Sequence, residues 1–403
     1  MAFIRGNLEK QVTKVPKTLK WCKKCVISNQ RPRISFDEDG VCSACNFYKY
    51  KFKVDWEKRD KELNILLDNH RSKNGEWDVI VPSSGGKDSV YVAHQLKSKY
   101  NMNPLLVTWS PLKYTDIGFQ NYNSLNDSGF TCIKANPNGL IQRKLARLCL
   151  EELGDAFHVF VLGQMFFPLH MALKFNIKLI FYGENGEPEY AGDPAMADKP
   201  YLDLIEDKKW TKDYLKGSGL NELIEYGIKN KDYLSEKDIT NADLSFYNPP
   251  SEKEMTDKGI RRHYYYSYYK NWDPQENFYY AVENSGFTPN PTRSEGTFSK
   301  YASLDDKLDG LHYYLRYIKF GLGRCSEDVA HEIREGHLTR EEGLALMKKY
   351  EGEFPEKYFE ECLDYLNITK DHFWDIVDSW RPDHLWKKKG NKWEIINNII
   401  NDN

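Results

Sequence analysis

The chain has 403 residues with 57 basic and 60 acidic side chains, which gives a formal net charge of −3. This length allows two or more domains with a sizeable core. The balanced charge argues against a nucleic-acid substrate, because nucleic-acid binding usually shows a basic excess. Residues 1–20 lack the apolar segment of a signal peptide, and no apolar run approaches membrane-spanning length. We therefore expect a soluble cytoplasmic protein with no membrane or nucleic-acid partner.

Two cysteine pairs follow a polar and basic N-terminal arm. The pairs are Cys22-Lys-Lys-Cys25 and Cys42-Ser-Ala-Cys45, with 16 residues between them. Each pair places two thiolates on one side of a tight turn, and together they can complete a tetrahedral Zn²⁺ site. A disulfide, a redox site and an iron–sulfur cluster are the alternatives. Four thiolates leave no open coordination position, so the predicted zinc is structural.

A short strand and a glycine turn come next, after a helix predicted over residues 47–70. Asp78–Val81 is a β-branched run that is typical of a buried parallel strand. Pro82 should end it, because proline has no N–H to donate to the next strand. Ser84–Ser89, which reads Ser-Gly-Gly-Lys-Asp-Ser, then leads into a helix predicted over Val90–Lys99.

This turn has the chemistry of an anion site. Its glycines let backbone N–H groups converge, and the start of the helix adds partial positive charge. Ser84 and Ser89 add hydroxyl donors, and Lys87 adds a point charge suited to phosphate. Asp88 could cap the helix or help to hold Mg²⁺. We interpret Ser84–Ser89 as a pyrophosphate cradle.

Strands and helices alternate beyond the turn, which predicts a doubly wound parallel sheet of the α/β class. The run His158–Leu162 is compatible with one more strand. The other predicted strands are Leu105–Trp109, Phe130–Lys134 and Lys178–Tyr182, and the other helices are Phe119–Asn126, Leu140–Leu153 and Met165–Leu173.

Ligands of such sheets bind at the carboxyl ends of the strands, where this sequence places several polar groups. Ser110–Asp116, Asn136–Gly139 and Gly183–Glu187 each follow a predicted strand. Glu184 is a candidate for Mg²⁺ binding or substrate orientation, and a plain turn is the alternative.

The remaining chain is less regular at first and then helical. Residues 191–259 have no clear period, and we predict a substrate-side insertion or lid. Residues 261–280 are rich in aromatic side chains that could stack on a sugar or base, or pack on the core or a partner. Asp305, Asp306 and Asp309 could face one another on a helix and bind Mg²⁺, or be solvated. The predicted division is 1–70, the arm and zinc module with its linking helix; 71–190, the nucleotide-binding domain; 191–300, a substrate or partner region; and 301–403, a helical C-terminal region.

Several motifs together carry a family resemblance over most of the chain. They are the four-cysteine module, Ser84–Ser89, Val107-Thr-Trp109, Tyr114-Thr-Asp-Ile-Gly118, Pro137-Asn-Gly139, Gly183-Glu-Asn-Gly-Glu187, Lys319-Phe-Gly-Leu-Gly-Arg324 and the segment 333–342. With these motifs the chain resembles the N-acetyl sugar amidotransferase family of the WbpG/PseA type, which belongs to the PP-loop ATP pyrophosphatase superfamily. The region 191–259 is matched least, and substrate choice could lie there.

The resemblance implies a PP-loop, HUP-like domain and an ATP-dependent, AMP-forming ligase. Such an enzyme converts an acetamido group of a nucleotide-linked bacterial surface sugar, of lipopolysaccharide or pseudaminic acid type, to an acetamidino group. ATP, Mg²⁺ and structural Zn²⁺ are the implied cofactors. The implied ATP and pyrophosphate site is Ser84, Gly85, Gly86, Lys87, Asp88 and Ser89. The implied catalytic residues are Lys87, Asp88, Glu184 and Lys319, and the implied substrate residues are Tyr114, Asp116, Asn185, Glu187 and Arg324.

The ammonia for this reaction should come from another protein. The four cysteines outside the zinc pairs lack a Gly-x-Cys-x-Gly setting, and residue 2 is Ala rather than a nucleophilic cysteine. The family resemblance implies a separate glutaminase of the histidine-biosynthesis type, with its cyclase-like subunit as a possible conduit.

Two other functions compete with this prediction. A zinc-containing PP-loop tRNA sulfurtransferase would need reactive cysteines near the loop, but Cys132 and Cys149 are isolated and the net charge does not suit tRNA. A non-catalytic nucleotide-binding scaffold for a glutaminase is the second, and an intact Ser84–Ser89 loop argues against it.

Overall fold

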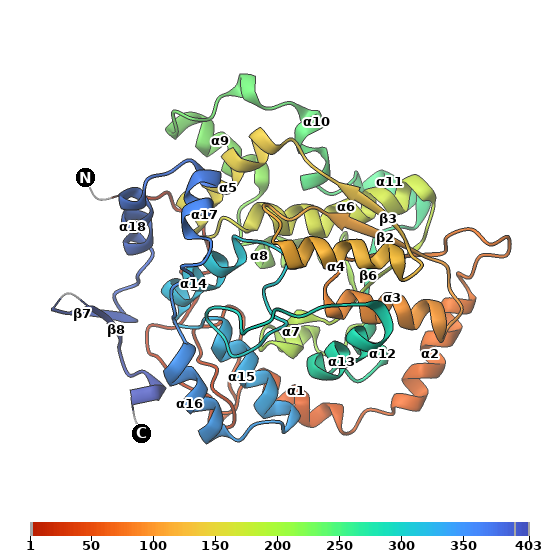
Figure 1. The fold of residues 1–403 in the computed structure, drawn as a ribbon, viewed down its shortest axis with the longest axis horizontal. Coiled ribbons are helices and arrows are strands. Elements are labelled where there is room, and N and C mark those ends of the chain that lie inside the picture. The colour runs from red at the N-terminus through yellow and green to blue at the C-terminus, as the bar shows by residue number, and fades with distance from the viewer. Residues whose placement is uncertain (1–2, 391, 402–403) are drawn as a thin grey trace.

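A computed structural model describes residues 3–390 and 392–401, and it contains a six-stranded sheet whose labelled strands lie in the right half of Figure 1. Ala2, which carried the prediction on an N-terminal nucleophile, lies outside the described residues. The strands are β1 (Val79–Pro82), β2 (Pro104–Trp109), β3 (Thr131–Ala135), β4 (Leu179–Tyr182), β5 (Tyr201–Asp203) and β6 (Arg262–Tyr265). Their order is β3-β2-β1-β4-β6-β5, and only the pairing of β5 with β6 is antiparallel. The predicted α/β class with a mostly parallel sheet is confirmed.

Helices surround this sheet and make up most of the C-terminal region, whose predicted helical character is also confirmed. They are α1 (Ser43–Lys51), α2 (Trp56–Asp68), α3 (Lys87–Ser98), α4 (Asp116–Asp127), α5 (Gly139–Leu153), α6 (His158–Phe175), α7 (Gly186–Glu189), α8 (Lys208–Tyr214), α9 (Leu220–Asn230), α10 (Asn241–Leu244), α11 (Glu252–Lys258), α12 (Tyr266–Tyr269), α13 (Pro274–Ser285), α14 (Asp309–Phe320), α15 (Arg324–Glu335), α16 (Arg340–Tyr350), α17 (Phe359–Leu366) and α18 (Lys370–Ser379). A hairpin of β7 (Trp386–Lys389) and β8 (Lys392–Ile395) follows them.

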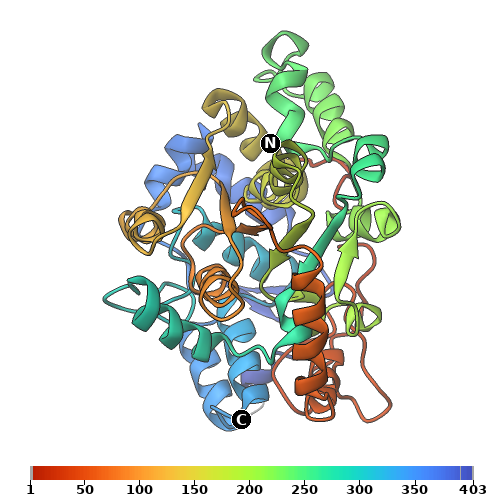
Figure 2. The same ribbon diagram turned by 90° about the vertical axis from the view of Figure 1, so that its right-hand side faces the viewer.

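Helices cover both faces of the sheet. Successive residues of a strand point to opposite faces, and in β1 the residues on both faces are apolar. Val79 and Val81 of β1 pack in one core cluster with residues of α3, whereas Ile80 packs with α5 and α6 in the other. Strand order reverses at β1, since β2 lies on one side of it and β4 on the other. Figure 2 shows these helices on either side of the strands. A doubly wound sheet of this kind leaves a crevice at the carboxyl ends of β1 and β4.

The run His158–Leu162 is not a strand. It begins α6, an 18-residue helix that crosses β1, β2 and β4 and contains Pro168. In a segment that is buried on all sides, apolar residues do not alternate with polar ones. The hydrophobic periodicity of the sequence therefore cannot distinguish a helix from a strand here. The sheet is instead extended by β5 and β6, from two regions in which no strand was predicted.

The N-terminal arm and cysteine module pack against distant parts of the chain. Leu8 and Glu9 of the arm are buried, and the Ser218 hydroxyl donates to the Leu8 carbonyl oxygen at 2.6 Å. The cysteine module shares a core cluster with residues of α15 and α16. The predicted division into four parts is not tested by these contacts and stays a prediction.

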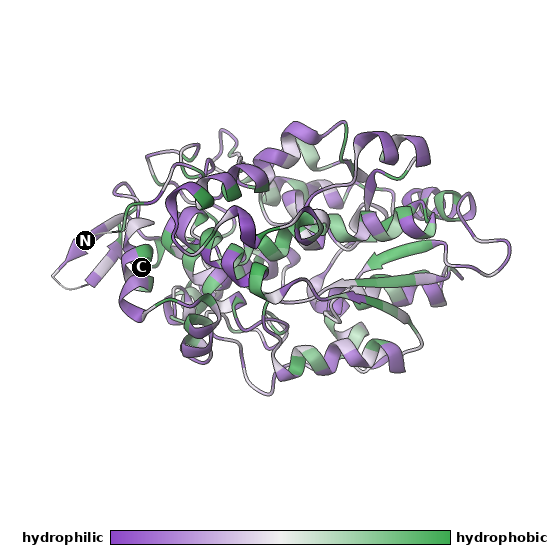
Figure 3. Cartoon of the chain, turned by 90° about the horizontal axis from the view of Figure 1, so that it is seen from above, coloured by the Kyte–Doolittle hydropathy of each residue, from purple (hydrophilic) through white to green (hydrophobic). Residues whose placement is uncertain are grey.

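Within residues 3–390 and 392–401, no single helix has the length and apolar character needed to cross a membrane. Only α5 and α6 taken together reach that length and composition, and they are bent by 119° relative to each other. Figure 3 shows the apolar residues concentrated on the strands and on the inner sides of the helices, as expected for helices packed around a core.

Candidate functional site

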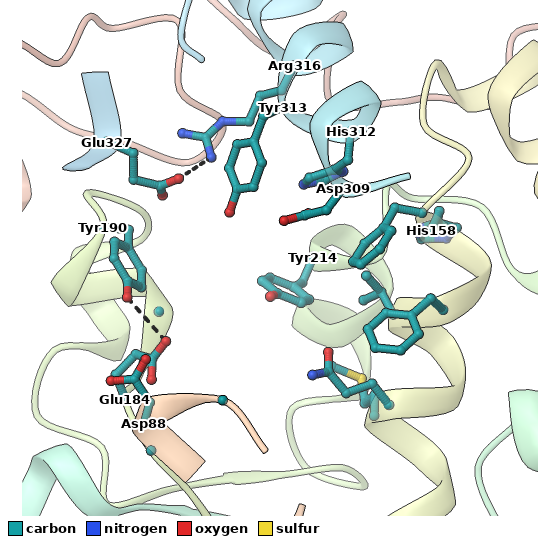
Figure 4. Close-up of a pocket in the computed structure, with 18 of the residues that line it drawn as sticks. Asp88, His158, Glu184, Tyr190, Tyr214, Asp309, His312, Tyr313, Arg316 and Glu327 are labelled. Atoms are coloured by element: carbon teal, nitrogen blue, oxygen red, sulfur yellow. Dashed lines mark hydrogen bonds and ion pairs between the residues drawn. The ribbon is translucent and has the colours of Figure 1, made fainter. Parts of the chain in front are cut away.

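A cavity of about 700 Å³ lies at the carboxyl ends of β1 and β4 (Figure 4). One side of it, here called the loop wall, consists of Ser84–Ser89 together with Glu184. A second part of the lining, here called the assembled wall, contains residues from four separate parts of the chain. These residues are Arg31, Arg33, Asp155, His158, Tyr214, Lys216, Asp309, His312, Tyr313, Arg316, Arg324 and Glu327.

The loop wall is an open turn between β1 and α3, as the sequence predicted. Gly85 has φ +92°, and a Cβ on it would lie 2.6 Å from the carbonyl carbon of Asn121 in α4. Only glycine fits such a close approach in this conformation. Gly86 is the N-cap of α3 and offers no side chain, so the first N–H groups of that helix are left for a ligand.

Hydrogen bonds hold the turn in this shape. The Ser89 hydroxyl donates to the Gly86 carbonyl oxygen at 3.0 Å and lies 2.9 Å from the Ser83 hydroxyl. Lys87 Nζ lies 2.5 Å from an Asp88 oxygen, and the Asn277 amide donates to the other Asp88 oxygen at 3.1 Å. Asp88 does not cap α3, which leaves its carboxylate beside the cavity.

Glu184 completes the loop wall and stands next to Asp88 (Figure 4). Tyr190 donates its hydroxyl to Glu184 at 3.3 Å. Burial raises the pKa of Glu184 to about 7, and the negative charge of Asp88 adds to the effect. Two carboxylates this close favour either a shared proton or a cation between them.

The three aspartates near residue 305 do not form one cluster on a helix. Asp305 and Asp306 precede α14, and only Asp309 belongs to it. Asp306 accepts backbone N–H bonds from Leu112 at 2.5 Å and Leu308 at 2.9 Å, so it fixes the loop after β2. Burial raises the pKa of Asp305 to about 6 and that of Asp306 to about 7. The sequence left open whether the three aspartates bind Mg²⁺ or are solvated, and they do not share the helix on which they could have faced one another.

Arginines dominate one part of the assembled wall. Glu327 pairs with Arg31 at 3.1 Å and also with Arg316, and Arg33 binds Glu187 through two bonds of 2.9 and 2.8 Å. Although burial works in the opposite direction, Arg316 and Arg31 lower the pKa of Glu327 to about 2. Arg31 and Arg33 lie between the two cysteine pairs, so the cysteine module itself contributes to the cavity.

A second part of the assembled wall is formed by a histidine–carboxylate pair. His312 Nδ1 lies 2.8 Å from one oxygen of Asp155, and Lys216 Nζ lies 2.9 Å from the other. Buried His158 also lines the cavity, and burial lowers its pKa to about 3. Sequence reasoning missed all four residues, because none of them belongs to a recognisable motif. Asp155 directly follows Gly154, the glycine at the C-terminal end of α5, which is the only signal that could have drawn attention to it.

The remaining predicted residues lie in different places. Lys319 lines the cavity but is buried, paired with Glu9, and donates to the Leu153 carbonyl oxygen at 2.7 Å. Arg324 bonds Asp328 at 2.9 Å and the Tyr313 hydroxyl at 2.5 Å.

Asn185 caps α7 and donates to the Met196 carbonyl oxygen at 2.8 Å, so it shapes the turn beside Glu184. Tyr114 and Asp116 are outside the set of described residues that line the cavity. Tyr114 packs behind the loop wall, in the same core cluster as α3, and Asp116 is exposed in the first turn of α4.

The four N-terminal cysteines form a metal-binding geometry. Their Sγ atoms all lie within 4.8 Å of one another, and all four residues are buried. The backbone N–H groups of Lys24 and Cys42 donate to Cys22 Sγ at 3.4 and 3.3 Å, which is an arrangement that favours a thiolate. The cluster could hold a zinc ion, because four thiolates at this spacing match tetrahedral zinc coordination.

Comparison with known proteins relates the C-terminal region to a named family. Residues 295–400 match the profile described as "LPS biosynthesis protein WbpG-like, C-terminal domain". A further relative is the uncharacterized protein MJ1599 of Methanocaldococcus jannaschii, which is 33% identical over 87 residues. That match covers 21% of this chain and 31% of the relative, so the chain spans about a third of the relative's length. Asp305, Asp309, His312, Arg316, Arg324 and Glu327 of the cavity lie in the WbpG-like segment.

Proposed function

We propose that this protein is an ATP-dependent amidotransferase of bacterial surface-sugar synthesis, which converts an acetamido group to an acetamidino group. One observation carries the proposal. The Ser84–Ser89 turn, which we predict to bind an anion, opens into the same cavity as the side chains of the WbpG-like segment. A nucleotide-binding loop of the PP-loop type and a sugar-specific region would therefore bind ATP and the sugar side by side in one cavity.

The reaction has two steps. The amide oxygen of the sugar attacks the α-phosphate of ATP, and pyrophosphate leaves. Ammonia then adds to the carbon of the O-adenylyl imidate, a proton is lost, and the C–O bond to AMP breaks. Adenylation is needed because an amide oxygen is a poor leaving group.

The loop wall suits the first of these steps. The N–H groups at the start of α3 and the Lys87 ammonium would stabilise the negative charge that develops on pyrophosphate. Asp88 and Glu184 supply carboxylate oxygens side by side and would hold the Mg²⁺ that accompanies ATP. Mg²⁺ would neutralise phosphate charge, and it would also favour the ionised form of Glu184.

The assembled wall would bind the sugar nucleotide. Arg324, Arg31 and Arg316 offer guanidinium groups. Arg31 and Arg316 both pair with Glu327, and Glu187 holds Arg33 in place. We expect Lys319 to act by fixing the arm through Glu9, because its ammonium is already bonded to a carboxylate and a carbonyl.

Ammonia would come from a separate glutaminase of the histidine-biosynthesis type, with its cyclase-like subunit as a conduit. Among the described residues, no cysteine lines the cavity, and Cys149, Cys325 and Cys362 are buried elsewhere. Burial also raises the pKa of half-buried Cys132 to about 11. These positions do not favour the tRNA sulfurtransferase alternative, which requires a reactive thiol near the loop.

Pyrophosphate release from ATP tests the proposal. Ammonium chloride replaces glutamine, and nucleotide-linked acetamido sugars are supplied one at a time while the product mass is recorded. We expect sugar-dependent release and a product about one mass unit lighter, since NH replaces oxygen. Lys87→Ala should lower the rate about 100-fold or more, whereas Lys61→Ala, on the exposed side of α2, should leave it unchanged.

The alternatives predict other results. Release that requires tRNA and a sulfur donor would favour the sulfurtransferase. ATP binding without pyrophosphate release, even with the glutaminase present, would favour a non-catalytic scaffold.

A further inference from the structure

The amination step creates a chemical need that the loop wall does not meet. When ammonia adds to the imidate carbon, its nitrogen becomes positively charged and must lose a proton before AMP leaves. A neutral base with a free lone pair suits this task. Lys87, Asp88 and Glu184 instead face the departing pyrophosphate, where cations and a metal ion are expected.

The assembled wall holds a candidate base in a fixed orientation. His312 Nδ1 lies 2.8 Å from Asp155. A carboxylate can only accept, so Nδ1 carries the hydrogen and the lone pair of the neutral ring is on Nε2. The ring also packs against Phe157, with ring centroids 5.3 Å apart. Asp155 and Phe157 therefore both restrict its rotation.

Asp155 is itself immobile. It is 4% exposed, follows Gly154 in the left-handed conformation (φ +61°), and accepts the Phe157 backbone N–H at 3.1 Å. Lys216 pairs with its second oxygen at 2.9 Å. Because Lys216 already neutralises much of its charge, Asp155 serves mainly to select the tautomer and direct the ring.

The free edge of His312 is accessible from the cavity. Its side chain is 23% exposed, it lines the cavity, and it lies on the side opposite Asp88 and Glu184 (Figure 4). Among the described residues, no hydrogen-bond partner is found for Nε2, whereas Glu184 on the loop wall is bonded to Tyr190.

We propose that His312 accepts the proton released when ammonia adds to the adenylated amide, and that Asp155 positions it. This inference rests on the proposed function. In the step, the ammonia lone pair forms the C–N bond, Nε2 takes one proton from that nitrogen, and the C–O bond to AMP breaks. The products are an acetamidino group, AMP and a protonated imidazole.

The test separates the two chemical steps in one experiment. Wild type and His312→Asn are mixed with ATP, ammonium chloride and the accepted sugar nucleotide, and the first turnover is quenched. Pyrophosphate and amidino sugar are then measured together. The asparagine amide can still donate to Asp155 but offers no basic nitrogen. We expect pyrophosphate release within about threefold of wild type and amidino sugar formation lowered by about 100-fold or more.

Chemical rescue and a matched pair provide the controls. Free imidazole should restore amidino sugar formation to His312→Ala, which a purely structural role would not allow. His372→Asn removes a comparable pair, His372 with Glu151 at 3.2 Å, outside the cavity and should leave both products unchanged. Asp309→Asn tests the neighbouring carboxylate on α14 as the alternative base.

Three results would contradict these proposals. Unchanged amination in His312→Asn, or loss confined to Asp309→Asn, overturns the assignment of His312. Equal loss of pyrophosphate and amidino sugar places His312 before amination and also overturns it. Absence of sugar-dependent pyrophosphate from wild type overturns the proposed function and this inference with it.

Discussion

The two walls of the cavity are built in different ways. The loop wall comes mainly from one short segment, Ser84–Ser89, and the groups proposed to bind phosphate are largely backbone N–H groups at the start of α3. The assembled wall collects side chains from the cysteine module, the turn between α5 and α6, the segment after α8, and α14 with α15. A backbone site is fixed by local conformation, whereas a side-chain site depends on how distant elements pack. Damage to one wall should therefore leave the other intact. Three predictions test this, and a fourth concerns a single proton on the loop wall.

Disruption of the four-cysteine cluster should have the largest effect. Arg31 and Arg33 lie between the cysteine pairs, so loss of this cluster should displace both from the cavity. For Cys22→Ser we expect a lower thermal midpoint and at least a 100-fold loss of sugar-dependent pyrophosphate release, because a zinc ion held by the four cysteines would stabilise the fold of its ligand loops. Calorimetric ATP affinity should stay within about threefold. Cys132→Ser in β3 is the control. Equal loss of ATP and sugar binding would show that the walls are not independent.

Gly85→Ala should produce the opposite pattern. The new Cβ would meet the Asn121 backbone at 2.6 Å in a left-handed conformation, so we expect a loss of stability of about 2–4 kcal/mol. ATP affinity should fall at least tenfold, while sugar-nucleotide affinity is retained. Gly75→Ala is the matched control, because Gly75 also has positive φ but its Cβ would meet nothing within 4 Å. Intact ATP binding in Gly85→Ala would contradict the role of the loop wall.

Arg316→Lys should weaken only the assembled wall. Lysine keeps the charge but loses the planar fork that reaches both Glu327 and the cavity. We expect KM for the sugar nucleotide to rise about tenfold to a hundredfold, as for a lost charge-assisted hydrogen bond, with KM for ATP unchanged. Arg143→Lys, on the exposed side of α5, serves as control. A rise in KM for ATP alone would reverse the assignment of the two walls.

The smallest effect should come from the proton on Glu184. Burial raises its pKa from 4.5 to about 7, so the native protein holds this proton more tightly than the unfolded chain. The contribution of this proton to the free energy of unfolding is fully present below about pH 4.5 and is lost as the pH rises through 7. Glu184→Gln should therefore be more stable than wild type at pH 8, by at most about 3 kcal/mol, and similar at pH 4.5. Thermal unfolding at both values measures this, with exposed Glu225→Gln as control. An equal gain at both values would exclude this proton as the cause.

The sequence alone determined the features that depend on neighbouring residues. β-Branched runs and glycine turns placed the first four parallel strands and most of their helices within a few residues. Cys22, Cys25, Cys42 and Cys45 gave the metal-binding cluster, because paired cysteines at short spacing form their own turn. The Ser84–Ser89 turn was also recognisable, since its shape follows from its glycines and the helix that it begins.

Only the tertiary structure decided the rest of the site. Whether His158–Leu162 formed a strand or a helix depended on burial against the sheet, which local periodicity does not report. The carboxylate of Asp306 is of a type that can bind a metal ion. In the folded protein it instead accepts hydrogen bonds from the backbone N–H groups of Leu112 and Leu308. His312 and Asp155 are 157 residues apart, and Arg31 is 296 residues from Glu327. A sequence lists these residues separately, and their chemistry exists only where packing brings them within hydrogen-bond distance.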